Sequence, residues 1–541
     1  MDTLLTINST ILEPNKDERP AAYAERLGRW YASLASAEQK KQFGQYFTTI
    51  QVAGFMAGLC QAKRETIRIL DPGAGAGVLA CAVSEHLATV SNKPSKLIIV
   101  AYETDAKLSA ILEKTLSFLR RQINKRGITV DFAIRNEDFV MKNAEALDES
   151  LRLFSSQPEK SDIVISNPPY FKIPKSDPRA RAAAAVVHGQ PNIYALFMAV
   201  AAFMLAPGGD FVFITPRSFA SGPYFRLFRE RFFAKMRPEH IHTFVSRTEA
   251  FNRDDILQEN MIMKARRFDG WLSKSKDTHI LVSSSNGASD LSILKPRKTL
   301  LEAVFDIAGV DKVLRIPVSE EDDELVRFIH AWPGSLKSYG LEISTGPVVP
   351  FRAVSLLSQT GKVPETHAPL LWMQHVRAMK IEWPISMRQK EQYVRLTNEA
   401  GPLLVADKNY VLLRRFSAKE ERRRLIAAPL IAGYLGSPRI GMENHLNYVH
   451  RPGGTLTVDE AWGLAALYNS SWLDTYFRVV NGNTQVSATE LRAMPLPPLK
   501  LIVEIGRKTR TSLDRIEEID SLVLPAFEGA HFKGEKTAVY A

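Results

Sequence analysis

Between about residues 66 and 265, the sequence predicts an α/β domain built on a doubly wound, mostly parallel sheet. Short apolar segments, typical of strands buried on both faces, alternate there with apolar helical segments. Strands separated by helices pair in parallel through right-handed crossovers, which places helices on both faces of the sheet. A glycine-rich turn follows the first strand, at the edge where such sheets bind their ligands.

Four segments are expected to form strands, and three are expected to form helices between them. The strands are TIRILDPGAG (66–75), KLIIVAYETD (96–105), SDIVISNPP (161–169) and GGDFVFITP (208–216). The helices are VLACAVSEHLATV (78–90), AKLSAILEKTLSFLRRQI (106–123) and NIYALFMAVAAFMLA (192–206). Helical periodicity at residues 21–37 predicts one more helix, packed on the outside of this domain.

The chain of 541 residues is long enough for two or three domains. We expect an N-terminal helical extension (1–40), the α/β domain (41–270), a second domain of mixed α+β character (271–500) and a C-terminal helix with a polar tail (501–541). The polar, turn-rich segment at residues 273–292 is the expected connector, because the strand–helix rhythm ends shortly before it.

Composition narrows the class of protein. The chain has 70 Lys and Arg against 59 Asp and Glu, a net charge of +11, which suits a polyanionic partner such as nucleic acid. Cys60 and Cys81 are too few for a disulfide framework or a cysteine-rich zinc site, so we expect buried thiols and no metal. No signal peptide or bilayer-spanning run is evident, which predicts a soluble, cytoplasmic protein.

The glycine-rich turn DPGAGAG (71–77) and two later acidic sites predict an adenosine-binding edge. The glycines let the backbone approach a ligand closely. Glu103 follows the second strand, where a carboxylate can accept two hydroxyls of a ribose, and Asp138 beside Phe139 can accept an adenine amino group. Each motif alone is also consistent with a tight loop or a solvated charge; their order along the chain favours a binding site.

The segment NPPY, Asn167 to Tyr170, ends the third predicted strand in a rigid loop. The Asn167 side chain and the Pro168 carbonyl are two acceptors suited to an amine with two N–H donors, such as an exocyclic amine of a base. The ring of Tyr170 offers a face on which a base can stack. The alternative interpretation is that the prolines only end the strand and Tyr170 covers the core.

Together these motifs resemble the N6-adenine DNA methyltransferases of the gamma arrangement, the modification enzymes of type II restriction systems. The resemblance implies a catalytic domain of the S-adenosylmethionine-dependent methyltransferase type and a target-recognition domain after it. GQYFTT (44–49) resembles the family's first motif. The implied cofactor-binding residues are Tyr46, Thr48, Asp71, Gly73, Gly75, Glu103, Asp138 and Phe139. The implied catalytic residues are Asn167, Pro168, Pro169 and Tyr170.

Residues after NPPY extend the resemblance. Phe251, in a loosely defined motif, would flank the extruded adenine opposite Tyr170, with Phe244 as the second candidate. STGPVVPFR (344–352) and NTQVSATELRAMPLP (483–497) look like sequences that recur in the family's recognition region. Because the cofactor motifs precede NPPY and a long segment follows it, the motif order matches the gamma arrangement.

A basic segment at residues 408–424 is the predicted phosphate contact of the second domain. The residues expected to bind DNA are Arg414, Arg415, Lys419, Arg422 and Arg423. The alternative is a solvated helix face on which Glu420 and Glu421 pair locally. ENHLNYVH (443–450) is rich in side chains that can read base edges.

The sequence therefore predicts an adenine-specific DNA methyltransferase that protects DNA from a cognate endonuclease encoded elsewhere. Methyl transfer from S-adenosylmethionine to adenine N6 requires the base to leave the duplex stack. We expect a monomer that works in the prokaryotic nucleoid. Two alternatives remain open: an NPPY enzyme that acts on RNA or a protein glutamine, and a non-catalytic DNA-binding specificity protein.

Overall fold

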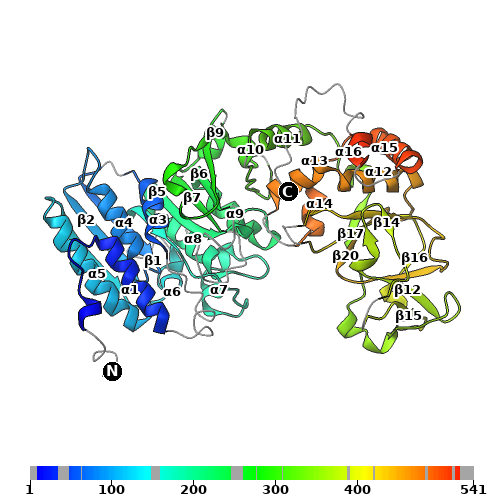
Figure 1. Cartoon of the computed structure of the whole chain (residues 1–541), viewed down its shortest axis with the longest axis horizontal. Helices are drawn as coiled ribbons and strands as arrows, with labels where there is room; N and C mark the ends of the chain where they lie inside the picture. The colour runs from blue at the N-terminus through cyan, green and yellow to red at the C-terminus, as the bar shows by residue number, and fades with distance from the viewer. Residues whose placement is uncertain are drawn as a thin grey trace. The chain divides into compact units, whose positions relative to one another are not determined.

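The computed structural model describes residues 9–34, 48–61, 64–147, 159–244, 260–275, 277–307, 309–317, 319–386, 390–417, 421–481, 485–513 and 518–523. The chain divides into two compact units, Met1–Val318 and Ser319–Ala541. In the described part, no helix has both the length and the apolar character needed to cross a bilayer. The two units, called unit 1 and unit 2 below, are described separately (Figure 1).

Within the described residues, unit 1 contains a nine-stranded sheet in the order β3-β2-β1-β4-β5-β7-β6-β8-β9. β1 to β5 are mutually parallel, whereas β7 runs antiparallel between β5 and β6. This arrangement confirms the predicted α/β fold class. The strands are β1 Thr66–Pro72, β2 Lys96–Tyr102, β3 Thr129–Arg135, β4 Ser161–Ser166, β5 Leu205–Pro216, β6 Met236–Phe244, β7 Asn260–Arg267, β8 His279–Ser285 and β9 Arg297–Leu300.

Helices cover both faces of this sheet (Figure 1). Alternate side chains of the central strands explain why: Ile163 and Ile165 of β4 join one apolar cluster, and Val164 joins another on the opposite face. The first cluster includes α3 and α4, and the second includes α8, whose twelve residues are all buried. The helices are α1 Pro20–Leu34, α3 Ile50–Gly58, α4 Val78–Leu87, α5 Ala106–Asn124, α6 Phe139–Asn143, α7 Pro178–Ala182, α8 Ile193–Met204, α9 Arg226–Phe233 and α10 Leu301–Val304.

The boundary between the units lies at residues 318 and 319, later than the expected boundary at residues 270 and 271. The segment at 273–292, expected to be a connector, contains β8, which pairs in parallel with β6. β9 then pairs with β8 and extends the sheet further. The prediction of a connector was wrong because the serines of β8 look like residues of an exposed loop. Ser283 and Ser285 are instead buried, and they hydrogen-bond His240 and His242 of β6.

Unit 2 is a mixed α+β structure. Its described residues form sheets in the orders β10-β20-β17-β18, β11-β15-β12-β19-β16 and β13-β14. The strands are β10 Glu342–Thr345, β11 Leu357–Ser358, β12 His367–Leu371, β13 Val376–Arg377, β14 Lys380–Ile381, β15 Tyr393–Arg395, β16 Leu404–Ala406, β17 Tyr410–Arg414, β18 Ala427–Leu430, β19 Arg439–Met442 and β20 Leu446–His450. The helices are α11 Glu320–His330, α12 Val458–Asn469, α13 Ser471–Val480, α14 Ala488–Ala493, α15 Leu499–Ser512 and α16 Ile519–Val523.

The C-terminal helix α15 belongs to the core of unit 2, whereas residues 501–541 were expected to be a separate segment. Its backbone lies directly against α12, because glycines on both helices allow close approach. A Cβ on Gly463 would lie 1.9 Å from the Ile502 carbonyl oxygen, and one on Gly506 would lie 1.8 Å from that of Asp459.

Gly463→Ala should therefore destabilise unit 2. The added methyl group meets rigid backbone, and overpacking of this kind costs about 1–3 kcal/mol. Urea unfolding followed by hydrogen exchange of unit 2 peptides measures the effect. Gly54→Ala in α3 is the matched control, since a Cβ there meets nothing within 4 Å and should be neutral or slightly stabilising. An unchanged midpoint for Gly463→Ala would contradict the α12–α15 contact.

Candidate active site

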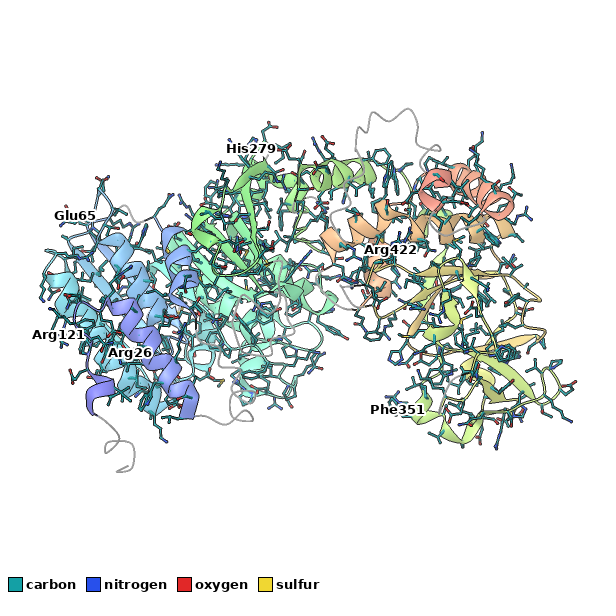
Figure 2. All side chains as sticks on the ribbon, viewed as in Figure 1. Arg26, Glu65, Arg121, His279, Phe351 and Arg422 are labelled. Atoms are coloured by element: carbon teal, nitrogen blue, oxygen red, sulfur yellow. The ribbon has the colours of Figure 1, made fainter. Side chains whose placement is uncertain are left out.

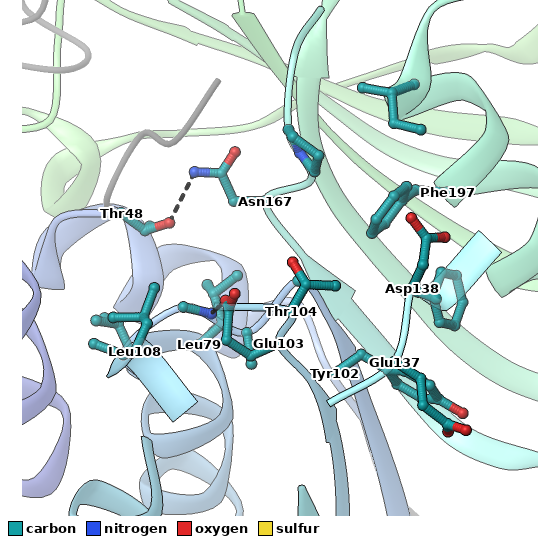
Figure 3. Close-up of a pocket in the computed structure, with 18 of the residues that line it drawn as sticks. Thr48, Leu79, Tyr102, Glu103, Thr104, Leu108, Glu137, Asp138, Asn167 and Phe197 are labelled. Carbon is teal, nitrogen blue, oxygen red and sulfur yellow. Dashed lines mark hydrogen bonds between the residues drawn. The ribbon is translucent and has the colours of Figure 1, made fainter. Parts of the chain in front are cut away.

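A cavity of about 270 Å³ opens at the carboxyl edge of β1, β2, β3 and β4 (Figure 3). Parallel strands bring the loops after them to one edge, so segments far apart in the sequence meet there. The register of β1 and β4 pairs Leu70 with Val164, which brings the glycine-rich turn beside the NPPY loop. The lining residues are Thr48, Gly73–Ala76, Val78, Leu79, Tyr102–Thr104, Leu108, Glu137–Phe139, Asn167, Pro169, Phe171, Arg179, Ile193 and Phe197.

The glycine-rich turn forms one wall of the cavity. Gly73 and Gly75 line it with φ values of +77° and +57°, a backbone conformation that favours glycine. The N–H groups of Gly73 and Ala74 donate to the Tyr102 carbonyl, which joins the turn to the end of β2. Gly77 has a different role, because a Cβ there would lie 2.7 Å from Leu112 and would separate α4 from α5.

Glu103 supports the turn and also faces the cavity. One carboxylate oxygen accepts the Gly75 N–H at 3.0 Å, and the other accepts the Asp105 N–H at 2.9 Å. Burial raises the pKa of Glu103, and these backbone N–H groups oppose the rise. Since each carboxylate oxygen has a second lone pair, Glu103 can still accept hydroxyl hydrogens from a ligand in the cavity.

Asp138 and Phe139 form the wall after β3. One oxygen of Asp138 caps α6 by accepting the Met141 N–H at 2.9 Å, and the other lies 3.9 Å from the Arg179 guanidinium. Phe139 is buried and packs edge-on against Tyr102. Its ring also contacts that of Phe197, with 5.3 Å between the two ring centroids. Arg179 and Phe197 both line the cavity and were missed in the sequence. No motif distinguishes Phe197 from the other apolar residues of α8.

Asn167 stands at the end of β4 with its side-chain amide in the cavity wall. Its Nδ2 donates to the Thr48 hydroxyl at 3.1 Å, and the two side chains point toward one another (Figure 3). Its Oδ1 accepts a hydrogen bond from the Tyr170 hydroxyl, which also lies 2.8 Å from the Ile214 carbonyl oxygen. A phenol carries one hydrogen, so Tyr170 can donate to only one of these two oxygens at a time.

The ring of Tyr170 is 6% exposed and packs edge-on against Tyr194, with 6.2 Å between ring centroids. This differs from the expectation that NPPY presents an open stacking face. The ring belongs to the same apolar cluster as the residues of α8. Pro168 is buried as well, whereas Asn167 and Pro169 line the cavity. The alternative interpretation of the sequence, in which Tyr170 covers the core, describes this conformation.

Asp71, the first residue of the DPGAGAG segment, is not among the residues that line the cavity. It is fully buried at the end of β1, although the resemblance predicted it at the methionine end of the cofactor. Burial raises the pKa of Asp71 to about 8; the Ala80 N–H opposes this and the negative charge of Glu103 adds to it. Among the described residues, no group of three metal-ligating side chains could hold a metal ion.

Three predicted residues, Tyr46, Phe251 and Lys419, lie outside the described residues. Phe244, the second candidate for the flanking aromatic, ends β6 and is 5% exposed. Its ring packs edge-on against His242, so it belongs to the core of unit 1 in this conformation.

The basic segment of unit 2 is not a helix face. Arg414 ends β17 and is half-buried; its Nε donates to the Val376 carbonyl, and burial lowers the pKa of the guanidinium. Arg415 donates to the carbonyl of Asn444, which is in the predicted base-reading segment 443–450. Arg422 is exposed (Figure 2), and Arg423 is partly exposed. The segment therefore divides into internal and surface arginines.

Comparisons with known proteins agree with this geometry. Residues 95–251 match the family model described as Eco57I restriction-modification methylase. The chain is 30% identical to the Type II methyltransferase M.BsuBI of Bacillus subtilis over 484 residues, covering 89% of this chain and 93% of that protein. It is 31% identical to the Type II methyltransferase M.PstI of Providencia stuartii over 487 residues, covering 88% and 92%.

A solved structure shares the fold. The Type IIL restriction-modification enzyme MmeI, solved in complex with DNA, aligns with 94% of this chain and 77% of its own, at 10% identity and a TM-score of 0.55. An identity this low shows a common fold and nothing more specific.

Asp71 should make the stability of unit 1 dependent on pH. Its pKa of about 8 in the folded state exceeds the ordinary value of 3.8, so folding favours the protonated carboxyl. The stability from this group is complete below about pH 4 and is lost as the pH rises toward about 8. Asp71→Asn removes the titration, so the free energy of unfolding should fall less over this range than in the wild type.

The comparison requires urea unfolding at several pH values, followed by hydrogen exchange of unit 1 peptides. Asp131→Asn is a suitable control, since that side chain is 58% exposed. Parallel pH profiles for the wild type and Asp71→Asn would contradict the assignment.

Proposed function

Because the chain belongs to the type II DNA methyltransferases of restriction-modification systems, we propose that it methylates the N6 amine of an adenine displaced from duplex DNA. Membership of the family supports the general statement that the protein methylates DNA. The position of Asn167 at the cavity supports the choice of an adenine amine as the target, since an amide oxygen there suits an exocyclic amine. The DNA methyltransferase relatives favour DNA over a protein glutamine or RNA.

The cavity has the groups that S-adenosylmethionine requires. Glu103 can accept the ribose hydroxyls through its remaining lone pairs. The oxygen of Asp138 that does not cap α6 can accept the adenine amino group, between the rings of Phe139 and Phe197. Backbone at Gly73 to Gly75 and the Thr48 hydroxyl remain for the methionine end. When bound, the cofactor supplies an electrophilic methyl group on a sulfonium.

Asn167 orients the amine that attacks this methyl group. Its Oδ1 can accept one N–H of the base, while the hydrogen of Tyr170 turns to the Ile214 carbonyl, 2.8 Å away. No polar group is then left unpaired by the exchange, which avoids a penalty of about 1–3 kcal/mol. With the Pro168 carbonyl as second acceptor, both hydrogens are held and the nitrogen lone pair is free to attack. The amine needs no base beforehand, because its proton becomes acidic only after methylation.

The substrate must leave the base stack, since N6 is engaged in pairing within the duplex. Stacking of the displaced adenine on Tyr170 and Phe251 remains a prediction; for Tyr170 it requires the base to reach a ring that is buried in this conformation. Asn167, by contrast, already lines the cavity.

Unit 2 is the proposed target-recognition domain, and its DNA contacts would include Arg415, Arg422 and Arg423. Arg415 holds the backbone of the segment at 443–450, and Arg422 is exposed. Arg414 is a weaker candidate, because its guanidinium is half-buried and donates to Val376. A separate cognate endonuclease and a monomeric state complete the proposal.

The N-terminal helix α1 helps to shape the cofactor site. The Tyr31 hydroxyl donates to one oxygen of Asp105, whose other oxygen caps α5 by accepting the Lys107 and Leu108 N–H groups. The Asp105 N–H donates to Glu103, which holds the Gly75 N–H. A hydrogen-bonded chain thus runs from α1 to the glycine-rich turn, and we assign Tyr31 as a positioning residue.

Asn167→Ala should lower methyl transfer about 100-fold or more, because a positioned polar contact to the reacting group is lost. Nucleoside mass spectrometry after reaction with duplex DNA measures N6-methyldeoxyadenosine directly, and calorimetry with S-adenosylhomocysteine checks that the cofactor still binds. Asn92→Ala, at an exposed loop position, is the control. Undiminished methylation by Asn167→Ala would refute the role of the NPPY loop.

Tyr31→Phe should raise the KM for S-adenosylmethionine by roughly 3- to 10-fold and leave kcat near its wild-type value, because the hydrogen bond to the charged Asp105 carboxylate is lost. Tyr23→Phe is the matched control: it also removes a tyrosine hydroxyl from α1, but one that donates to the Leu12 carbonyl and is not part of the hydrogen-bonded chain to Glu103. Equal effects of the two substitutions would mean that α1 acts only through general stability.

A further inference from the structure

Tyr224 is an exposed aromatic residue in a segment whose other large residues are mostly buried. It lies in the short helix Pro223–Phe225 after β5 and is 57% exposed. Phe219 and Phe228, close to it in sequence, are at most 1% exposed. Among the described residues, its hydroxyl has no hydrogen-bond partner, so hydrogen bonding within unit 1 does not account for its position.

The ring of Tyr224 is seated on the loop that follows NPPY. A Cβ on Gly189 would lie 2.2 Å from Cδ1 of Tyr224, so the ring packs directly on glycine backbone. Its neighbour Phe225 stacks on Tyr194 at 5.7 Å, and Tyr194 in turn packs against Tyr170 of the catalytic loop. The residue next to Tyr224 is therefore connected to the catalytic loop through two aromatic contacts.

The two segments that carry Gly189 and Tyr224 are basic. The segments after β4 and β5, at residues 171–190 and 217–226, contribute the exposed side chains Lys172, Lys175, Arg181, His188 and Arg226. Within these two segments, six Lys and Arg stand against one acidic residue, Asp177, which pairs with Arg179. The acidic groups on neighbouring elements are Asp138, 3.9 Å from Arg179, Asp311, 3.9 Å from Arg226, and the exposed Glu137, Glu145 and Glu230. The excess of cations in the two segments suits the phosphates of a nucleic acid.

We propose that these two segments, named the rim surface, bind the duplex around the target base, and that Tyr224 stacks on the neighbouring bases exposed when that base leaves. This inference rests on the proposed function and extends it to a residue with no part in the NPPY chemistry. Displacing a base loses its stacking on the neighbouring bases, and an aromatic ring that stacks there restores part of this stabilisation. The cations of the rim surface would bind the phosphates on either side of the target base. Gly189 has no side chain, which lets the Tyr224 ring lie against the loop backbone.

The test compares Tyr224→Ala with the wild-type protein on two duplexes that carry the modification site of the wild type. In one duplex the target adenine is paired with thymine; in the other it faces a mismatch, which makes displacement easier. Tyr224→Ala should lower kcat/KM for the paired duplex by roughly 5- to 20-fold and for the mismatched duplex by less than about 3-fold. The KM for S-adenosylmethionine should not change, which also shows that the variant is folded.

Two further variants sharpen the comparison. Gly189→Ala should give the same pattern, because its methyl group displaces the ring without removing it; the φ of +77° at this position adds strain to the loop backbone. Phe268→Ala should behave as the wild type: Phe268 is 39% exposed, but it follows β7, which runs antiparallel to β5 and ends at the opposite edge of the sheet.

The outcomes separate this inference from the proposed function. If the wild type forms no N6-methyladenine on either duplex, the proposed function fails. If the wild type methylates the paired duplex and Tyr224→Ala does so equally well, the role of Tyr224 is refuted and the proposed function stands. An equal loss on both duplexes would also overturn it, since Tyr224 would then bind DNA without replacing the displaced base.

Discussion

The hydrogen bonds that fix the Asn167 amide are the constraint on which the active site depends. The nitrogen donates to Thr48, in the segment that leads into α3, and the oxygen accepts from Tyr170, whose ring is packed against α8. The amide therefore joins structure from both faces of the sheet at the end of β4. Because the oxygen's partner can turn to the Ile214 carbonyl, the amide is held before substrate arrives and can still exchange its hydrogen bond for one to an amine.

Sequence reasoning predicted the parts of the site that follow from strand order. Glu103 and Asp138 could be located because parallel strands deliver their following loops to one edge. Phe197 and Arg179 could not, because selecting one side of a wholly apolar helix or the direction of a loop cation requires packing information. The burial of Tyr170 and Asp71 could not be predicted for the same reason, because it depends on which side chains pack against each residue. In β8, buried serines satisfied by His240 and His242 looked like a polar connector.

The N-terminal helix α1, in a segment predicted to be an extension, belongs to unit 1. Arg19, just before α1, pairs with the buried Glu85 of α4, and Glu25 accepts the Ile50 N–H at the start of α3. Tyr31 donates to Asp105, which directly follows the cavity-lining residues Glu103 and Thr104. These contacts join α1 to both ends of the cavity wall, so docking of the helix and the shape of the cavity are expected to be coupled.

A crystal structure with a non-reactive analogue of S-adenosylmethionine and a duplex carrying the modified site tests the central claim most directly. The account predicts the adenine outside the stack, with its N6 within about 3 Å of both the Asn167 Oδ1 and the Pro168 carbonyl oxygen, and with Tyr170 donating to Ile214. An adenine bound in the cavity while Asn167 keeps its hydrogen bond to Tyr170, with N6 held by other groups, would contradict it.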